Sequence, residues 1–347
     1  MLPPLAEVRD VHRFDEEALA RWLAAHVEGF RGPLTVRQFR GGQSNPTYHL
    51  EAAGREYVLR RKPPGKLLPS AHAVDREYRV ITALGTTGFP VPRTYALCAD
   101  PDVIGTIFYV MDCVHGRVIT DPQIPGATPR ERAGIYDSLN ETLARLHTTD
   151  WRALDLADFG RPGSYFARQI HRWTQQYRAS ETETIEAMER LIEWLPAHLP
   201  ADDETTLVHG DFRLGNTIIH PTEPRVVAVL DWELATLGHP LADLAYHCLP
   251  YRFARDWEGL ADKDLRELGI PTEQEYLAAY CRRTGRAAIA DWEFCLAFSM
   301  FRLSAIAQGI MGRVVAGTAN DPNARERGRR ARPLAEQAWA LLATRAG

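Results

Sequence analysis

One polar loop between two apolar runs constrains this chain more than any other feature. Residues 207–220 read LVHGDFRLGNTIIH, and the loop carries His209, Asp211 and Asn216 between segments apolar enough to be buried strands. After a short turn, a second apolar run ends in Asp231. If the two runs pair as a hairpin, Asn216 lies close to Asp231 at its open end. The sequence therefore predicts a cluster of polar side chains where two short strands end.

This cluster has the composition of a metal and phosphate site. Asn216 and Asp231 offer an amide oxygen and a carboxylate, which suit Mg²⁺, an ion that takes its other ligands from phosphates and water. Asp211 is free to accept a proton from a hydroxyl that attacks phosphorus. The alternative is that Asp211 and Asn216 are turn residues that satisfy backbone groups. The pairing strand and its terminal Asp231 favour the phosphate site.

Periodicity along the chain predicts an α+β protein with two lobes. Asp15 is expected to cap an N-terminal helix, and a helix is expected again from about residue 70 to Leu84. On both sides of the second helix, apolar and polar residues alternate with a period of two. This alternation indicates an antiparallel sheet of five strands, the last of which ends near Asp112. The expected strands are 34–39, 47–52, 57–62, 89–98 and 105–112.

Beyond residue 112 the spacing of apolar residues becomes helical. Capping boxes at Thr128–Glu131 and Thr272–Glu275 mark the starts of two of the expected helices. We therefore expect a nucleotide-binding lobe at 1–112 and a helical lobe at 113–347, with the catalytic loop and the acceptor site in the second. Late apolar residues are expected to be core, although some could line an acceptor pocket: Trp292, Phe294, Phe298, Met300 and Phe301.

Composition argues against several classes of protein. The net charge of −4 does not favour nucleic acid as a partner. The first 17 residues carry charges too early for a signal peptide, and no apolar run approaches the length of a bilayer span. The five cysteines form no CxxC pair, which argues against a disulfide framework or a zinc site. We expect a cytoplasmic protein without a membrane partner; the oligomeric state is left open.

The N-terminal half supplies candidates for holding a nucleotide. The turn 41–45, with Gly42 and Ser44, could bring backbone N–H groups near phosphates, although glycines in a hairpin need no ligand. A cation at Arg60 could hold phosphates, with Glu77 of the next helix orienting it. The alternative for Arg60 is an exposed, basic strand end.

Two motifs resemble those of a known family. HGDFRLGN followed by LDWE is similar to the catalytic loop and metal-binding segment of the aminoglycoside phosphotransferase and choline kinase family, small-molecule relatives of the protein kinases. VLRRKPPGKLLPSAHAVDREYRV and LDWELATLGHPLADLAYHC resemble especially the branch that also occurs fused to acyl-CoA dehydrogenases. The resemblance covers nearly the whole chain, and it implies a protein-kinase-like fold with ATP and Mg²⁺ as cofactors.

The resemblance also implies roles for residues of the loop and hairpin. Asp211 would be the catalytic base or the carboxylate that orients the acceptor hydroxyl. Asn216 and Asp231 would bind the magnesium ions that bridge the ATP phosphates. His209 would buttress the catalytic loop.

For the nucleotide, the resemblance points to the N-terminal lobe. Arg60 matches the strand position that holds ATP phosphates, and Glu77 matches its helix partner. Met111 would lie at the end of the adenine pocket. The backbone of Asp112 and Val114 would hydrogen-bond adenine.

The chain departs from the protein-kinase pattern at several positions. Arg60 stands where most kinases have Lys, and because Arg is a fixed fork the phosphate geometry should change. Lys62, on the same strand face, is a rival for the role. Trp232–Glu233 follows Asp231 where protein kinases have Phe-Gly, which argues against a mobile activation loop.

Three further features of the C-terminal half bear on the site. Arg213 could neutralise phosphate charge during transfer or could pair with Asp243 or Glu233, and the sequence leaves both open. Asp243 is expected to brace the catalytic loop from behind. The basic run 325–332 is usually a solvated face, but it could form an anion site for a phosphorylated or CoA-linked acceptor.

The expected function is that of a small-molecule kinase. It would transfer the γ-phosphoryl group of ATP to a hydroxyl of a metabolite, such as a hydroxyacyl-CoA, or of an aminoglycoside-like acceptor. The alternative is a nucleotide-binding pseudokinase that serves as a partner module, which the complete set of Asp211, Asn216 and Asp231 argues against. A protein kinase is disfavoured because no activation segment is recognisable between Asp231 and Asp243.

Overall fold

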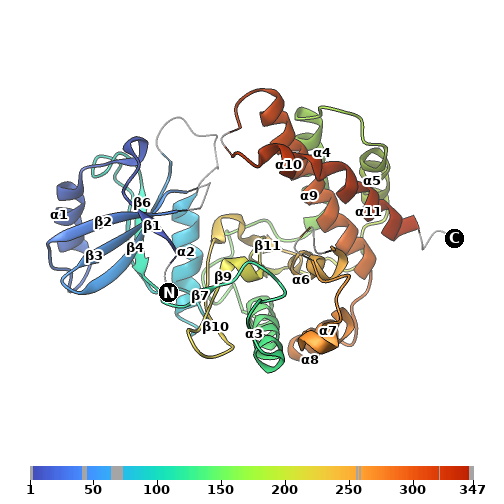
Figure 1. Cartoon of the computed structure of the whole chain (residues 1–347), viewed down its shortest axis with the longest axis horizontal. Helices are drawn as coiled ribbons and strands as arrows, with labels where there is room; N and C mark the ends of the chain where they lie inside the picture. The colour runs from blue at the N-terminus through green and yellow to red at the C-terminus, as the bar shows by residue number, and fades with distance from the viewer. Residues whose placement is uncertain are drawn as a thin grey trace.

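In a computed structural model, the chain folds into an N-terminal lobe built on a sheet and a mostly helical C-terminal lobe (Figure 1). The structure describes residues 3–40, 45–63, 73–254, 257, 259–319 and 321–343. The turn that contains Gly42 and Ser44 therefore lies outside the described residues. The expected two-lobed α+β architecture is confirmed.

The sheet of the N-terminal lobe is antiparallel and has the order β1-β2-β3-β4-β6-β5. The five expected strands are present, but the sheet has a sixth. The extra strand, β1, is only two residues long and pairs with the end of β2, so it carries no periodic signal that a sequence reading could detect. The strands are β1 (Leu5–Ala6), β2 (Leu34–Phe39), β3 (Thr47–Ala52), β4 (Arg55–Arg61), β5 (Thr94–Cys98) and β6 (Phe108–Asp112).

Alternation along β4 separates the two faces of this sheet. Tyr57 and Leu59 are buried in the cluster that also contains residues of α1 (Glu16–His26). Val58 belongs instead to the larger core, which includes α2 (Val74–Gly85) and extends through the C-terminal lobe. Asp15 caps α1 as expected, since its Oδ1 accepts a hydrogen bond of 2.8 Å from the amide of Ala18. Arg60, two residues beyond Val58, consequently points to the α2 face.

The C-terminal lobe is built around the long helix α9, which is packed against α4, α6, α10 and α11 (Figure 1). Thr128 accepts a hydrogen bond from the amide of Glu131, and Thr272 and Glu275 form a complete capping box, so both expected helix starts are confirmed. The helices are α3 (Pro129–His147), α4 (Tyr165–Ala179), α5 (Glu186–Ala197), α6 (Pro240–Cys248), α7 (Leu265–Leu268), α8 (Glu273–Thr284), α9 (Trp292–Val315), α10 (Ala324–Arg329) and α11 (Ala331–Ala343).

Helix α9 corrects one expectation. Among the described residues it is the one helix long and apolar enough to cross a membrane by length and composition, although no run of that kind was expected from the sequence. Its apolar window is 72% buried within the protein, which is the pattern of a core helix. The late apolar residues Trp292, Phe294, Phe298, Met300 and Phe301 are all buried, in agreement with their expected place in the core.

Short strands next to the helical core carry the polar loop identified in the sequence. β9 (Thr217–Ile219) pairs antiparallel with β10 (Val226–Val229) and with β7 (Arg117–Val118). The loop itself lies between β8 (Thr206–Val208), which pairs with β11 (Thr236–Gly238), and β9. Two small sheets thus hold both ends of residues 209–216.

Candidate active site

The expected hairpin is present, and it brings Asn216 to the end of β10. The amide of Leu230 donates a hydrogen bond of 2.8 Å to the carbonyl oxygen of Asn216. Asp231 follows directly and has φ +67°, a left-handed conformation that is uncommon for a residue with a side chain. The backbone therefore turns sharply where a metal ligand was expected.

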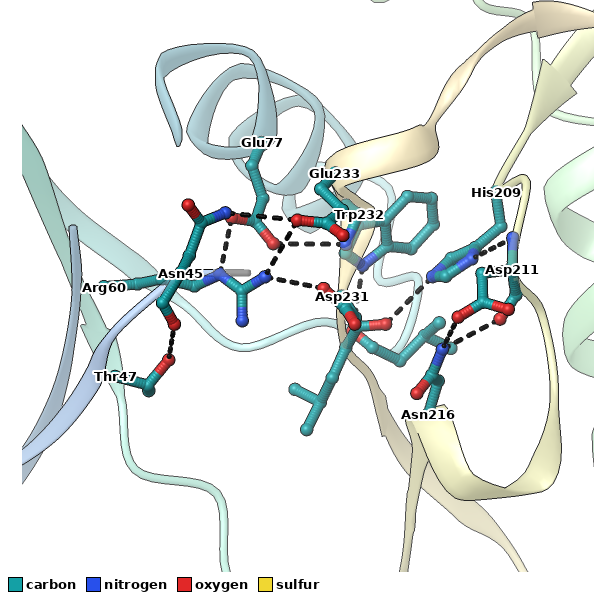
Figure 2. Close-up of polar contacts among 12 residues, drawn as sticks. Asn45, Thr47, Arg60, Glu77, His209, Asp211, Asn216, Asp231, Trp232 and Glu233 are labelled. Atoms are coloured by element: carbon teal, nitrogen blue, oxygen red, sulfur yellow. Dashed lines mark hydrogen bonds and ion pairs between the residues drawn. The ribbon is translucent and has the colours of Figure 1, made fainter. Parts of the chain in front are cut away.

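Asn216 also fixes the candidate catalytic carboxylate. Its Nδ2 donates to Oδ2 of Asp211 over 2.7 Å and to the Asp211 carbonyl oxygen over 2.9 Å (Figure 2). Because the amide nitrogen is committed to Asp211, the amide oxygen of Asn216 remains the group that can face a cation. With the carboxylate of Asp231, it forms an oxygen donor pair that fits Mg²⁺.

His209 lies behind this pair and links the loop to the hairpin. It is fully buried, and its Nε2 lies 2.9 Å from the carbonyl oxygen of Leu230. The amide of Asp211 donates to His209 Nδ1 over 3.1 Å, so Nε2 carries the proton that is given to Leu230. Both ring nitrogens are occupied by the backbone, which supports a buttressing role and not proton transfer.

Asp243, at the start of α6, braces the loop from the other side as expected. Its two carboxylate oxygens accept hydrogen bonds from the amides of His209 (2.6 Å) and Gly210 (2.7 Å). Burial alone would raise the pKa of Asp243, but His147 and the His209 amide outweigh burial and hold that pKa below its usual value. The carboxylate is therefore ionised while it accepts these hydrogen bonds.

A further brace, Arg302, was not predicted from the sequence. Nη2 of Arg302 donates to the carbonyl oxygen of Gly210 over 2.7 Å, and Arg302 is buried in α9. Gly210 has φ +82°, and a Cβ there would lie 2.7 Å from the Leu234 carbonyl oxygen, so a side chain does not fit. An arginine in the middle of a long apolar helix was the available signal, because a buried charge needs a specific partner.

The lobes meet at an arginine held by several carboxylates. Arg60 Nε donates to Glu77 Oε2 over 2.8 Å, and its Nη2 donates to Asp231 Oδ1 over 2.6 Å (Figure 2). Glu77 Oε1 accepts from the amide of Trp232, 3.2 Å away. Burial favours a neutral Arg60, but the charges of Glu77 and Asp231 outweigh it and raise the pKa, so the guanidinium stays protonated.

Lys62 is placed differently from its rival. Its Nζ lies 3.6 Å from Asp75 Oδ1, near the start of α2, whereas Arg60 faces the hairpin and the cavity beside it. Asn45 and Glu233 join the same junction, since Asn45 Nδ2 donates to Glu233 Oε2 over 3.3 Å (Figure 2). The sequence did not predict this pairing, because the contact joins segments 188 residues apart.

A cavity of about 250 Å³ lies between the lobes, next to Arg60. Met111, Asp112 and Val114 line it, as expected for residues around an adenine ring. The Asp112 amide already donates to the carbonyl oxygen of Arg93 over 2.8 Å, so of its two backbone groups only the carbonyl is available to a ligand. Apolar side chains from both lobes complete the walls: Val58, Ile81, Ile218 and Leu230.

A second cavity, of about 660 Å³, is lined by Asp211. Asp211 is the only carboxylate among the described residues that line it, whereas four arginines do so: Arg213, Arg302, Arg327 and Arg330. Tyr246 also lines this cavity, and burial, followed by the charge of Asp211, raises the pKa of its phenol. The late aromatic residues of α9 do not line this cavity. The arrangement offers a polar, positively charged chamber with one carboxylate at its edge.

Arg213 points to neither of the partners considered for it. Its Nε lies 3.5 Å from Oδ2 of Asp211, and half of its side chain is exposed. Asp243 is instead engaged by the loop amides and His147, and Glu233 by Asn45 and Arg60. Arg213 therefore lies beside the candidate catalytic carboxylate, on the side of the larger cavity.

Known proteins that share this family resemble the chain in sequence and fold. Residues 35–297 match the model of a family described as the phosphotransferase enzyme family. The chain is 47% identical over 342 residues to acyl-CoA dehydrogenase family member 10 of Mus musculus, covering 97% of this chain and 32% of that protein. It is 46% identical over 320 residues to acyl-CoA dehydrogenase family member 11 of Homo sapiens, covering 90% of this chain and 41% of that protein. The chain thus spans less than half the length of these relatives.

Among solved structures, a putative aminoglycoside phosphotransferase from Ralstonia eutropha superposes with a TM-score of 0.89 at 53% identity, covering 96% of this chain and 99% of that one. A choline kinase from Cryptosporidium parvum superposes with a TM-score of 0.68 at 13% identity, covering 96% and 97% of the two chains. At that identity the second likeness shows the fold alone.

Proposed function

Because the chain belongs to the phosphotransferase enzyme family, we propose that it is an ATP-dependent kinase of a small molecule that carries a hydroxyl group. The observation that carries this proposal is the position of Asp211. It lies in the loop between β8 and β9 and lines the arginine-lined cavity, whereas Asp231 of the neighbouring hairpin lines the inter-lobe cavity. Asn216 orients the Asp211 carboxylate. A carboxylate so placed can meet a hydroxyl from one side and a γ-phosphate from the other.

In this reaction Asp211 orients the acceptor hydroxyl and accepts its proton as the new bond to phosphorus forms. Asn216 Oδ1 and the Asp231 carboxylate would hold Mg²⁺, which supplies charge neutralisation on the β- and γ-phosphates. The protein contributes mainly positioning, so the rigidity of the loop matters. His209, Asp243 and Arg302 provide that rigidity through their hydrogen bonds to the loop and hairpin backbone.

Arg60 would hold the ATP phosphates, with Glu77 as its fixed partner. Its guanidinium is protonated, largely buried and already aimed at Asp231, the proposed metal ligand. Adenine would fill the apolar part of the cavity near Met111, with the Asp112 carbonyl oxygen and the Val114 backbone as its partners. We also propose that Gly42 and Ser44 contribute to binding these phosphates.

For the acceptor, we favour an anionic metabolite, and a hydroxyacyl-CoA in particular, over an aminoglycoside. Arg213, Arg327 and Arg330 line the cavity beside Asp211 and would repel the amines of an aminoglycoside. Phosphates of a CoA moiety would be attracted by the same side chains. The relatives that share this domain are named as acyl-CoA dehydrogenase family members, and an acyl-CoA is the chemical class of the proposed acceptor.

A panel assay tests this proposal. Purified protein with Mg²⁺ and ATP labelled at the γ-phosphate is incubated with 3- and 4-hydroxyacyl-CoAs, the matching free hydroxy acids, and aminoglycosides. Label is expected on a hydroxyacyl-CoA and is expected to be absent with an Asp211→Asn variant. Label only on aminoglycosides would reject the anionic acceptor, and nucleotide binding without transfer to any acceptor would favour a pseudokinase.

A further inference from the structure

A group of side chains of metal-binding type lies on the central strands of the N-terminal sheet, and it shares no residue with the proposed magnesium site. His49 on β3, Glu56 on β4 and Cys113 directly after β6 place a nitrogen, an oxygen and a sulfur within 4.8 Å of one another. His49 Nε2 lies 2.8 Å from Glu56 Oε1, and His115 Nε2 lies 2.5 Å from Glu56 Oε2. We call these four residues the linker cluster, because two of them lie in the segment that leaves the sheet for the C-terminal lobe.

Sheet register accounts for this convergence. Glu51 pairs with Glu56 across β3 and β4, so His49, two residues from Glu51, shares the strand face of Glu56. Tyr57 pairs with Asp112 across β4 and β6, so one more residue along each strand brings Glu56 opposite Cys113. Three of the four side chains are therefore held by neighbouring strands of one sheet, which is the rigid support that a metal site needs.

We propose that the linker cluster is a zinc site, with His49, Glu56 and Cys113 as ligands and His115 as the fourth. Imidazole, carboxylate and thiolate are the usual ligands of Zn²⁺ in proteins, and four of them in a tetrahedral arrangement make a structural site. One thiolate and one carboxylate balance the two charges of the ion. On binding, the thiol of Cys113 loses its proton to solvent.

The distances are compatible with this assignment. Metal–ligand bonds of about 2.0–2.3 Å at tetrahedral angles separate neighbouring donor atoms by roughly 3.3–3.7 Å. The donors of His49, Glu56 and Cys113 already lie within 4.8 Å of one another, and the His49–Glu56 contact of 2.8 Å has only to open slightly. Half of the His115 side chain is exposed, whereas His49 is buried, so an ion can enter from the His115 side.

Hydrogen bonds alone explain only part of the cluster. Two histidines that share one carboxylate form an ordinary ion-pair network, and this network accounts for His49, Glu56 and His115. It does not require a thiol near the same point. The sulfur of Cys113 distinguishes the two explanations, because a soft ligand strengthens zinc binding but adds little to a network of hydrogen bonds.

The location of the cluster gives the metal a consequence for the nucleotide. Cys113 also lines the inter-lobe cavity, next to Asp112 and Val114. An ion bound by His49, Glu56 and Cys113 would fix the start of the linking segment against β3 and β4. This role goes beyond phosphoryl transfer and does not depend on which acceptor is phosphorylated.

Metal binding by the full chain, measured without nucleotide, tests the proposal. After treatment with a chelator, the protein is titrated with Co²⁺, and the absorption band that arises only from thiolate–cobalt coordination is recorded. Zn²⁺ is then used to displace Co²⁺, and zinc content is measured by mass spectrometry after gel filtration. We expect one bound ion per chain and a thiolate band that Zn²⁺ abolishes.

Variants locate the ion. Cys113→Ser should remove the thiolate band and weaken zinc binding about a hundredfold or more, since even residues that only support a metal ligand contribute about 10–100-fold. His115→Gln should weaken binding while keeping the band. Cys281→Ser is the matched control, because Cys281 is also a partly buried free cysteine, and it should bind as the wild type does. Asp231→Ala should likewise keep the band, which separates this site from the proposed magnesium site.

Two results would overturn the zinc site. One is wild-type protein that holds less than stoichiometric zinc after gel filtration and shows no thiolate band with Co²⁺. The other is equal zinc affinity in wild type and in Cys113→Ser, with circular dichroism confirming that the variant is folded. If Cys113→Ser does not fold, the band in the wild type and its loss on adding Zn²⁺ decide the question.

Discussion

Arg60 of the N-terminal lobe and Asp231 of the C-terminal hairpin form an ion pair, with Nη2 of the arginine 2.6 Å from Oδ1 of the aspartate. Glu77 holds the same guanidinium through Nε, so the arginine is fixed before any ligand binds. A preorganised cation next to the proposed metal ligand would lower the cost of ordering the phosphates of ATP. The cross-lobe contact therefore makes the proposed nucleotide site dependent on how the two lobes pack.

Replacing Arg60 tests its role in holding phosphates. Arg60→Lys keeps the charge but loses the planar, forked guanidinium, so we expect Mg-ATP affinity to fall by only about threefold. Arg60→Gln removes the charge as well and should reduce the affinity by at least about tenfold, since a hydrogen bond to a charged group contributes about 1.5–3 kcal/mol. Lys62→Gln is the control and should leave affinity nearly unchanged, because Lys62 pairs with Asp75. Isothermal titration with Mg-ATP gives these affinities. A larger loss in Lys62→Gln would assign the phosphates to Lys62.

Removing the Asp211 carboxylate should separate catalysis from binding. We expect Asp211→Asn to lower kcat by about a hundredfold or more, the range of a general base, while Mg-ATP affinity changes little. The amide keeps an oxygen that can accept the hydrogen bond from Asn216, so the loop should remain in place. The rate of single-turnover phosphoryl transfer, measured with the acceptor that the panel assay identifies, gives the size of the effect. Wild-type turnover in this variant would remove Asp211 from the mechanism.

Asp231 should behave differently from Asp211. As a proposed metal ligand, it contributes to the bound nucleotide as well as to the reaction, so Asp231→Ala should weaken Mg-ATP binding and turnover together. The variant also frees Arg60 from one partner, and nucleotide binding without Mg²⁺ should then be affected less than binding with it. Titrations of ATP at several Mg²⁺ concentrations distinguish the two effects. An unchanged dependence on Mg²⁺ would argue against a ligand role.

Much of this site could be predicted because it lies in one local hairpin. The approach of Asn216 to Leu230 and the bracing of the loop by Asp243 follow from short apolar runs and a helix start near the loop. Contacts between distant segments could not be predicted in this way. Arg302 reaches Gly210 from 92 residues away, and spacing does not reveal such pairs.

The same limit applies to the strands and the cysteines. The two-residue strand β1 is too short to carry a period, so the sheet was expected to have five strands and has six. The absence of a CxxC pair argued against zinc, but spacing tests only ligands that are close in sequence. The ligands proposed for the linker cluster come from three strand-linked segments, which only sheet register brings together.

Asp243 should be important for stability. Asp243→Ala leaves the amides of His209 and Gly210 without their acceptor, and we expect the free energy of unfolding to fall by about 3 kcal/mol or more, since each buried unsatisfied group costs about 1–3 kcal/mol. Asp137→Ala removes an exposed partner of Arg283 and should cost less than about 1 kcal/mol. Urea unfolding of both variants measures the difference. Similar midpoints for the two would contradict the bracing role.

The ionisation of Asp243 also predicts a dependence of stability on pH. Its pKa is lower in the folded protein than the ordinary value of 3.8, so the folded state favours the carboxylate. The resulting stabilisation is fully present above that ordinary pKa and is lost as the pH falls through 3.8 towards the folded value. Wild type should therefore lose stability relative to Asp243→Asn as the pH falls below about 4. A constant difference between pH 6 and pH 3 would show that folding does not lower the pKa of Asp243.

Helix α10 offers a matched test of the acceptor. Arg327 and Arg330 line the cavity beside Asp211, whereas Arg325 and Arg329 lie on the same short segment, are exposed, and are not among the lining residues. Arg327→Ala and Arg330→Ala should each raise KM for an anionic acceptor by about twofold to fivefold, because a partly exposed charged contact contributes up to about 1 kcal/mol. KM for ATP should stay constant, since ATP is proposed to bind in the other cavity. Arg325→Ala and Arg329→Ala should change neither KM. An equal rise of the acceptor KM in all four variants would show that overall charge, and not a contact in the cavity, causes the effect.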